Sequence, residues 1–128
     1  MELSQYNQLG GEKGVQRLVD RFYDLMDERE DVSELRDLHA KSLKGSRQKP
    51  FLFLSGWLGG PSLYIEKYGH PRLRSRHFPF KITSLESEQW MKCMRQALQE
   101  QITNDDLLLM NLTSSFEKVA NHMRNTTD

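Results

Sequence analysis

The sequence predicts an all-α fold, a small sandwich of helices, and three observations support this. Apolar residues recur at spacings of three and four in four separate segments of the 128-residue chain, which is the period of one helix face. No segment alternates polar and apolar residues as a half-buried strand would. The stretch Gly59-Gly60-Pro61 interrupts the chain between the second and third segments. This interruption favours a sandwich over a regular four-helix bundle.

The pattern in the N-terminal part of the sequence predicts one long helix followed by short turns. The apolar stripe within residues 15–26 marks a helix that is entered after Gly10-Gly11. Tyr23 lies on this helix. Residues 31–49 have dense charges and few apolar side chains, so we expect short turns there, with His39 among them.

The second long helix ends at the diglycine before Pro61, because glycine and proline together stop a helix. Pro50 stands near the start of this helix or produces a kink, since proline is tolerated in the first turn but not in the interior. Ser46 lies just before the helix. The wide apolar face of the helix consists of Phe53, Leu54, Trp57 and Leu58.

Two more helices are predicted towards the C-terminus. Thr83 followed by Glu86 matches a capping box, and an apolar stripe continues behind it as far as Ile102. The run Asn104-Asp105-Asp106 gives the last helix a polar start. The apolar positions of that helix are Leu108, Leu112, Phe116, Val119 and Met123.

Size and charge bound the class of protein. A chain of 128 residues can remove roughly two-thirds of its unfolded surface from water as a single domain. We therefore expect one domain over residues 1–128. Eighteen Lys and Arg balance eighteen Asp and Glu, so no global field attracts nucleic acid or an anionic membrane. We expect neither as a partner.

Two features favour a cytoplasmic protein. The first 25 residues carry many charges and no uninterrupted apolar segment, which argues against a signal peptide or a membrane span. Cys93 is the only cysteine, so the chain can form no internal disulfide and no site with several thiolates. We expect Cys93 to be a small buried apolar residue and assign it no chemistry.

The stretch from Gly69 to Phe80 places a histidine, His77, at a helix end among apolar and basic neighbours. Pro71 can open a short helix, and Pro79 disfavours its continuation, so His77 falls in the last turn. No acid occurs from residue 67 to 85, whereas the same region supplies the cations Lys67, Arg72, Arg74, Arg76 and Lys81. Apolar walls, one imidazole and several cations suit a flat apolar cofactor with two carboxylates. Haem, with its iron bound by His77, is such a cofactor.

The histidines also allow other interpretations. A histidine with apolar neighbours is, taken alone, more often a hydrogen-bonded core residue than an iron ligand, but the surrounding motif favours the ligand. A zinc site is disfavoured, because His70 and His77 on one helix would lie about 10 Å apart along its axis, while zinc ligands lie about 2 Å from the ion. We expect His70 in a loop and His122 on the outer face or at the end of the last helix.

Several motifs together resemble the truncated haemoglobins, specifically their group II or O-type branch. In chain order they are Gly10-Gly11, Arg21-Phe22-Tyr23, Trp57-Leu58-Gly59-Gly60-Pro61 with Tyr64, the stretch from Gly69 to Phe80, and Trp90 with Cys93-Met94. Each motif is weak alone, but together they are specific and cover most of the chain. The resemblance implies a two-over-two α-helical sandwich, the truncated globin fold, that holds haem b (iron protoporphyrin IX).

The resemblance also implies roles for single residues. His77 corresponds to the proximal iron ligand, Tyr23 to the distal tyrosine and Trp90 to the pocket tryptophan. The remaining distal positions are His39, Ser46 and Pro50. Pro50 departs from the pattern expected for the family, and it removes a backbone hydrogen-bond donor from that side of the pocket.

Further residues are expected to hold the cofactor. Arg72 and Arg76 lie four residues apart on one helix face and are the best candidates for pairing with the haem propionates. The other expected haem contacts, besides His77, are Phe53, Leu54, Leu73, Phe80 and Trp90.

These roles imply a haem protein that binds O₂, CO, NO or peroxide as small ligands. Tyr23, Trp90 and His39 can donate hydrogen bonds to bound O₂, with Ser46 as a weaker donor. Such donors slow O₂ release, which favours redox use, such as NO detoxification by oxidation to nitrate, over bulk transport. A reductase is then an expected partner. Weak peroxidase activity ranks lower, because no acid lies near His77 in the sequence to strengthen its imidazole.

Two alternatives stay open at this point. His39 could itself bind the iron when no ligand is present, which would give a hexacoordinate haem protein suited to electron transfer. The chain could also be a haem-free helical interaction protein, with the aromatic stripes as core and the basic run as partner surface. Cofactor content separates the last possibility from the others.

Overall fold

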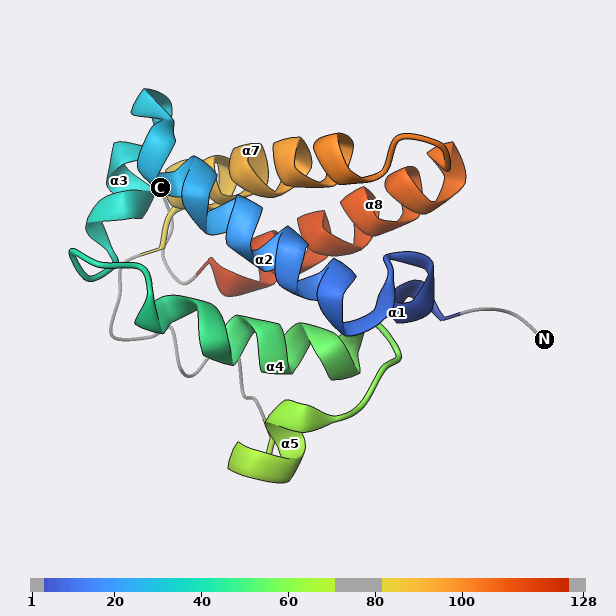
Figure 1. The fold of residues 1–128 in the computed structure, drawn as a ribbon. Coiled ribbons are helices and arrows are strands. Elements are labelled where there is room, and N and C mark those ends of the chain that lie inside the picture. Colours follow the sequence, from blue (N-terminus) through green and yellow to red (C-terminus); the bar gives the residue numbers. More distant parts are fainter. Residues whose placement is uncertain (1–3, 71–81, 125–128) are drawn as a thin grey trace.

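Helices provide all the regular structure in residues 4–70 and 82–124, the parts of the chain that this computed structural model describes (Figure 1). The long helices are α2 (Gly11–Glu28), α4 (Gln48–Trp57), α7 (Ser84–Gln101) and α8 (Asp106–Met123). The short elements are α1 (Gln5–Gln8), α3 (Ser33–Asp37), α5 (Leu63–Tyr68) and the 3₁₀ turns η1 (Glu30–Val32) and η2 (Gly45–Arg47). The four predicted long helices are therefore confirmed, and so are the short turns expected over residues 31–49.

The long helices stack in two pairs, as the predicted helical sandwich requires. α7 and α8 run antiparallel and pack on each other (Figure 1). α2 packs on α7 and also on α4, and α3 packs on α7. Helix α2 thus joins the two layers, and α3 lies where the chain passes from α2 to α4.

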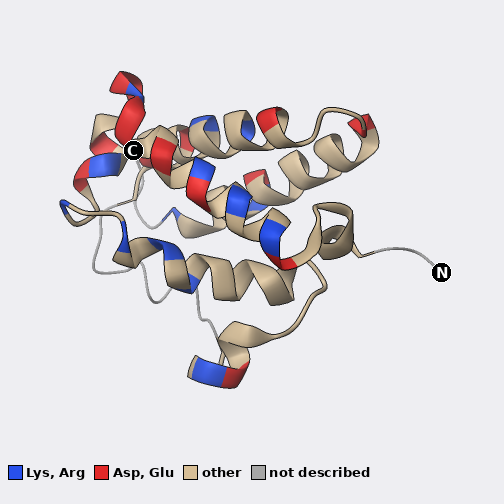
Figure 2. Cartoon of the chain, in the orientation of Figure 1, with Lys and Arg blue, Asp and Glu red and all other residues tan. Residues whose placement is uncertain are grey.

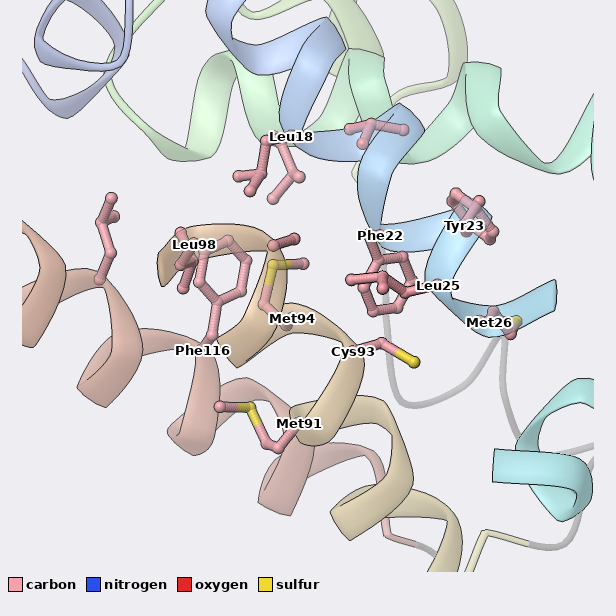
Figure 3. Packing of buried hydrophobic residues seen from close by; sticks show 14 of the residues in the cluster. Leu18, Phe22, Tyr23, Leu25, Met26, Met91, Cys93, Met94, Leu98 and Phe116 are labelled. Atoms are coloured by element: carbon pink, nitrogen blue, oxygen red, sulfur yellow. The ribbon is translucent and has the colours of Figure 1, made fainter. Parts of the chain in front are cut away.

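The core lies where α2 meets α7 and α8. Figure 3 shows Leu18 of α2 facing Leu98 of α7 and Phe116 of α8, and all three side chains are almost completely buried. Burying a side chain of this size contributes about 1.5–3 kcal/mol of transfer free energy. Cys93 is fully buried in the same cluster, as predicted, and burial raises the pKa of its thiol to about 11. The thiol therefore stays protonated at neutral pH and acts as a small apolar group.

Side-chain caps fix the start of α7 and of α8 where the sequence placed them. The Asp105 carboxylate accepts a hydrogen bond from the backbone N–H of Leu108 at 3.0 Å. The Thr83 hydroxyl oxygen accepts one from the backbone N–H of Leu85 at 3.2 Å, and the same hydroxyl donates to the Glu86 carboxylate. Thr83 and Glu86 thus cap α7 together, through a contact between their side chains.

The two ends of α4 follow from its glycines and its proline. The N–H of Gly60 bonds to the carbonyl of Ser55 at 2.8 Å and that of Gly59 to Gly56 at 3.0 Å, which is a Schellman motif. Gly59 has φ +95°, a conformation that favours glycine. Pro50 is the third residue of α4, where a backbone N–H has no partner within the helix. The proline therefore lies in the first turn of the helix and does not kink it.

Charged residues of both signs lie along α2, as Figure 2 shows. Arg21 pairs with Glu28 on the same helix at 2.9 Å and with Glu100 of α7 at 2.7 Å. These exposed pairs join α2 to α7 at the surface. In the described part of the chain, no helix combines the length and the apolar character needed to cross a bilayer.

Candidate functional site

An apolar cavity of about 350 Å³ lies among α2, α3, α4, α7 and α8. Protein interiors are close-packed and hold few voids larger than a water molecule, whereas ligand and cofactor pockets span about 300–1,000 Å³. The cavity therefore has the size of a binding site. It brings together six of the residues predicted from sequence: Tyr23, His39, Pro50, Phe53, Leu54 and Trp90.

Most other lining residues are aliphatic or aromatic, and no sequence motif marked them as part of a site. They are Val19, Phe22, Leu35, Leu38, Trp57, Tyr64, Ile82, Met94, Phe116, Val119, Ala120 and Met123. The helical stripes identified several as buried, but periodicity does not distinguish a core position from a cavity wall. The polar lining residues that were missed are Lys49, Glu86 and Ser87. Of these, Glu86 had a sequence signal only as a helix cap.

Tyr23 supplies a buried phenol to the cavity from α2. Its side chain is 7% exposed, and its ring meets Phe22 edge to face at a centroid distance of 5.0 Å. Burial raises the pKa of Tyr23 to about 12, and the positive charge of Arg47 partly opposes this effect. The phenol is therefore a neutral O–H donor over the whole physiological range.

The raised pKa of Tyr23 predicts a specific loss of stability at high pH. An unfolded tyrosine ionises near pH 10, while the native phenol keeps its proton up to a pKa of about 12. Within this window the unfolded state binds fewer protons, so the free energy of unfolding falls as pH rises, by roughly 3 kcal/mol in all. Urea titrations across the window should show this fall in the parent protein. In Tyr23→Phe this fall in the free energy of unfolding should be smaller, because the phenol that causes it is absent.

The matched control for this experiment is Tyr68→Phe, the same change at an exposed tyrosine of α5. That variant should keep the high-pH slope of the parent. A slope in Tyr23→Phe equal to the parental slope would contradict the assignment of a buried, neutral phenol.

Trp90 lies on α7 on another wall of the cavity. Its ring is 5.2 Å from that of Phe22 and 5.9 Å from that of Phe116, measured between centroids. These aromatic neighbours from α2 and α8 fix the position of the indole. Its Nε1–H can only donate a hydrogen bond, so Trp90 is a second donor group in the lining.

His39 follows α3, and its ring orientation is defined by its own backbone neighbours. The Nδ1 atom lies 3.0 Å from the carbonyl oxygen of Leu35. A carbonyl only accepts, so Nδ1 carries the proton, and Nε2 holds the lone pair when the ring is neutral. The His39 and Tyr23 rings stand edge to face, 6.1 Å apart. A neutral His39 therefore offers an acceptor at Nε2, and Nε2 donates only when the ring is protonated.

The structure does not bring Ser46 to the described lining of the cavity, although it does bring Pro50. Ser46 is half-buried in η2, before α4 begins. The next residue, Arg47, ties this turn to α2, because its guanidinium pairs with Asp24 at 2.8 Å and with Asp20 at 3.3 Å. The turn that precedes α4 is thus held on α2 beside Tyr23, whose ring centroid lies 6.0 Å from the guanidinium carbon of Arg47.

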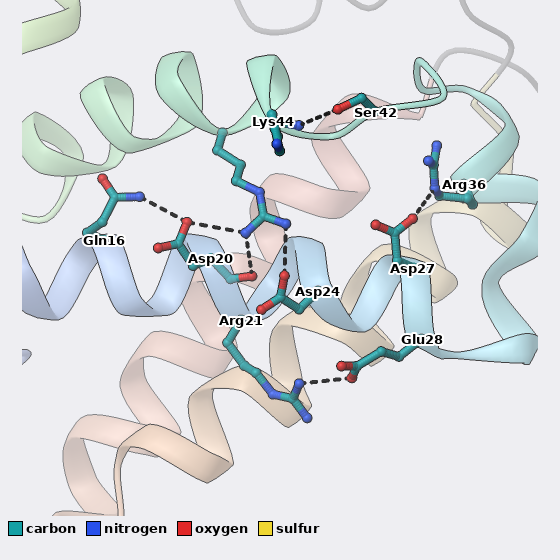
Figure 4. A network of polar contacts seen from close by, with 10 residues as sticks. Gln16, Asp20, Arg21, Asp24, Asp27, Glu28, Arg36, Ser42 and Lys44 are labelled. Carbon is teal, nitrogen blue, oxygen red and sulfur yellow. Dashed lines mark hydrogen bonds and ion pairs between the residues drawn. The ribbon is translucent and has the colours of Figure 1, made fainter.

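A second arginine holds the segment between α3 and η2. Arg36 pairs with Asp27 of α2 at 2.6 Å, a contact drawn in Figure 4. The same guanidinium donates to the carbonyls of Ala40 at 2.7 Å and Lys41 at 2.5 Å. The chain on either side of His39 is therefore anchored to the C-terminal half of α2.

Five predicted site residues lie outside the described residues: Arg72, Leu73, Arg76, His77 and Phe80. The short basic helix expected around them also lies there. Of the other histidines, His70 is exposed outside any helix and His122 is exposed in the last turn of α8, as predicted.

The lining fits the haem expected from the sequence. Its walls are aromatic and aliphatic, which suits the porphyrin ring. Its polar groups are few, and those of Tyr23 and Trp90 can donate hydrogen bonds. Lys49 is exposed and also lines the cavity, so a cation stands where the cavity meets solvent, as a propionate requires.

Comparison with known proteins gives results in agreement with this geometry. A family model described as bacterial-like globin matches residues 4–125. The group 2 truncated haemoglobin YjbI of Bacillus subtilis (strain 168) is 35% identical over 118 residues, which cover 92% of this chain and 86% of that protein.

Solved structures agree over almost the full chain. A cold-adapted truncated haemoglobin from the Antarctic marine bacterium Pseudoalteromonas haloplanktis TAC125 superposes with a TM-score of 0.93 at 45% identity, covering 97% of this chain and 99% of that one. A group II 2-on-2 haemoglobin from the plant pathogen Agrobacterium tumefaciens superposes with a TM-score of 0.93 at 38% identity, covering 99% and 97%.

Proposed function

Because this chain belongs to the bacterial-like globins, and among them to the group II truncated haemoglobins, we propose that it binds O₂ and other diatomic ligands for redox chemistry on NO or peroxide, rather than for bulk transport. Its fold is the two-over-two helical sandwich, and its cofactor is haem b. Bound haem b supplies an iron with a coordination position for O₂, CO or NO. Family membership sets aside the haem-free interaction protein considered above.

The observation that carries this proposal is the presence of two fixed hydrogen-bond donors in one apolar cavity. Tyr23 contributes Oη–H from α2 and Trp90 contributes Nε1–H from α7. A hydrogen bond to a group that carries charge contributes about 1.5–3 kcal/mol. Apolar surroundings exclude water that would compete for these donors. Two such bonds slow the release of bound O₂ too much for efficient O₂ transport. They therefore favour a reaction of the bound O₂.

Oxidation of NO to nitrate is the reaction we propose first, with consumption of peroxide as the second. Either use requires electrons from outside the chain, so the proposal includes a reductase as a partner. We propose a cytoplasmic location, in keeping with the single cysteine. Residues 1–128 act in this proposal as one haem-binding domain.

His77 is proposed as the residue that binds the iron, with Arg72 and Arg76 on the propionates and Leu73 and Phe80 against the ring. These assignments rest on the sequence motif. A neutral imidazole suits iron as a ligand, and Arg guanidinium groups match carboxylates in geometry.

Replacing His77 by alanine tests this function. We expect the haem-loaded, O₂-saturated parent to convert added NO to nitrate, and His77→Ala to lose this conversion together with the parental absorption spectrum. The helices should remain, as read by far-UV circular dichroism. His122→Ala, a change at an exposed histidine of α8, should behave like the parent. Parental nitrate yield and spectrum in His77→Ala would overturn the assignment.

A second candidate function is favoured by the His39 ring. Since Nδ1 donates to Leu35, the Nε2 lone pair of a neutral His39 is chemically able to bind the iron. His39 lines the cavity, and occupation of the sixth position by His39 would favour electron transfer over ligand uptake.

His39→Ala decides between the two candidates. If His39 binds the iron, the parent should have a low-spin ferric spectrum at neutral pH and the variant a high-spin one. An unchanged low-spin spectrum in the variant would exclude His39 as the internal ligand and leave Tyr23 as the next residue to test.

A further inference from the structure

We propose that Gln89 of α7 is a positioning residue for His39, acting through the backbone of Leu35. The side chain of Gln89 holds the Leu35 N–H, and the Leu35 carbonyl holds the His39 ring. This inference rests on the proposed function, in which the cavity that His39 lines holds the ligand. It adds a residue that lies outside the described lining of the cavity.

Gln89 is a buried polar residue whose two amide atoms have fixed partners. Its side chain is 4% exposed, and buried polar groups are stable only when they are hydrogen-bonded. Its Oε1 accepts from the backbone N–H of Leu35 at 2.9 Å, and its Nε2 donates to the Glu34 carboxylate at 2.6 Å. The partners fix the orientation of the amide, because an N–H needs the oxygen and a carboxylate needs the nitrogen.

The bond to Leu35 supplies what α3 lacks at its N-terminus. Leu35 is the third residue of α3, so its N–H has no partner within the helix. The N-cap residue, Val32, provides no side-chain hydrogen bond. A helix of five residues is not stable alone. Gln89, which is 54 residues further along the chain, therefore caps α3 from another helix.

The same residue, Leu35, determines how the His39 ring is held, through its carbonyl in the next peptide unit. Its carbonyl accepts from the backbone N–H of Leu38 at 3.1 Å and from Nδ1 of His39 at 3.0 Å. Fixing the N–H side of α3 therefore fixes the carbonyl that selects the Nδ1–H form of the ring. Trp90 follows Gln89 directly and lines the cavity. One turn of α7 thus supplies a cavity donor and, next to it, the residue that positions His39.

The first experiment is a double-mutant cycle on the haem-loaded protein. Gln89→Leu keeps the approximate size of the side chain and removes both hydrogen bonds. The rate of O₂ dissociation from the ferrous protein is measured for Gln89→Leu in the parent and in the His39→Ala background. In the parent background we expect Gln89→Leu to slow O₂ dissociation by about threefold to tenfold, because loss of the Nδ1–H form lets Nε2–H of a neutral His39 donate one hydrogen bond to O₂. In the His39→Ala background the change should be below about twofold.

Gln99→Leu is the matched control, because Gln99 is exposed on the same helix. It should leave the dissociation rate unchanged in both backgrounds. An effect of Gln89→Leu that is equally large with and without His39 would overturn the proposal, since Gln89 would then act on the fold in general.

Nuclear magnetic resonance of the His39 ring nitrogens in the CO-bound protein reads the positioning role directly. The parent should show the proton on Nδ1, and Gln89→Leu should lose the dominance of this form. An unchanged Nδ1–H signal in Gln89→Leu would also overturn the proposal. If O₂ dissociation does not depend on His39 but the Nδ1–H signal still depends on Gln89, the positioning role stands and the proposed function of His39 fails.

If Gln89→Leu does not fold, an exchange of the side chains at positions 89 and 34 tests the same contact. Gln89→Glu alone places a second carboxylate against Glu34 and should disturb the His39 signal. Gln89→Glu combined with Glu34→Gln restores one acceptor for Leu35 N–H and one amide donor, and should recover the parental Nδ1–H signal. Absence of recovery in the combined variant, with the fold intact, would contradict the relay through Leu35.

Discussion

Removing both donors from the cavity, by Tyr23→Phe together with Trp90→Leu, is expected to speed O₂ release from the ferrous protein by more than about a hundredfold. The estimate follows from two hydrogen bonds of about 1.5–3 kcal/mol each to a ligand with partial charge. Tyr23→Phe removes only the hydroxyl and keeps the edge-to-face contact with Phe22. The measurement is stopped-flow displacement of O₂ by CO.

The two single variants apportion the effect between the donors. Each should release O₂ faster than the parent, and Tyr68→Phe, at an exposed tyrosine, should not. A double variant that releases O₂ within about threefold of the parental rate would show that neither group holds the ligand, because even one neutral hydrogen bond changes the rate by about that factor.

Gly14→Ala is expected to destabilise the protein by about 3 kcal/mol or more, the upper range for overpacking. A Cβ at Gly14 would lie 1.8 Å from the carbonyl oxygen of Leu9 and 2.5 Å from its carbonyl carbon. Both are backbone atoms, so no side-chain rotation relieves the clash. The Gly14 carbonyl also accepts a hydrogen bond from Gln101 at 2.8 Å, so a shift of α2 would loosen its contact with α7. Urea unfolding at neutral pH measures the loss.

Gly45→Ala is the control for this substitution. A Cβ at Gly45 would meet no atom within 4 Å, and the backbone there has no positive φ. We expect a change within about 1 kcal/mol, and a gain in stability is consistent with the lower entropy of the unfolded alanine chain. Equal stability of Gly14→Ala and Gly45→Ala would contradict the close approach of α1 to α2.

The parts of the fold that the sequence predicted are those specified by local patterns. The apolar stripe of α2 repeats every three or four residues, and Asp105 caps α8 by bonding to a residue three positions later. The glycines after α4 likewise act on the last turn of that helix. Such signals are readable from one sequence, because the spacing of side chains along a helix is fixed.

The short helix α3 could not be predicted for a physical reason. Its N-terminal N–H at Leu35 is satisfied by Gln89 from a distant part of the chain, and no local pattern encodes such a contact. The tautomer of His39 depends on the carbonyl of Leu35, four residues earlier, and therefore on the formation of α3. The expectation that a neutral His39 donates to a ligand changes once Nδ1 is seen to bond to Leu35.

The residues of the candidate site also differ in whether a sequence motif marks them. Tyr23 and Trp90 were found through motifs that resemble a family. Lys49 and Glu86 also line the cavity, but Lys49 carries no motif and Glu86 only a helix-capping signal, so neither pointed to a binding site. Ser46 was expected in the distal set, but it lies in η2, outside the described lining of the cavity. Its place before α4 agrees with the sequence, but the short turn η2 does not carry its side chain into the described lining.

Absorption spectra of the purified protein in ferric, dithionite-reduced and CO-bound forms show whether it holds a haem whose iron is accessible to diatomic ligands. We predict a strong Soret band that shifts when CO binds to the reduced protein. Absence of a Soret band after addition of haem, or a band that does not respond to CO, would contradict the account.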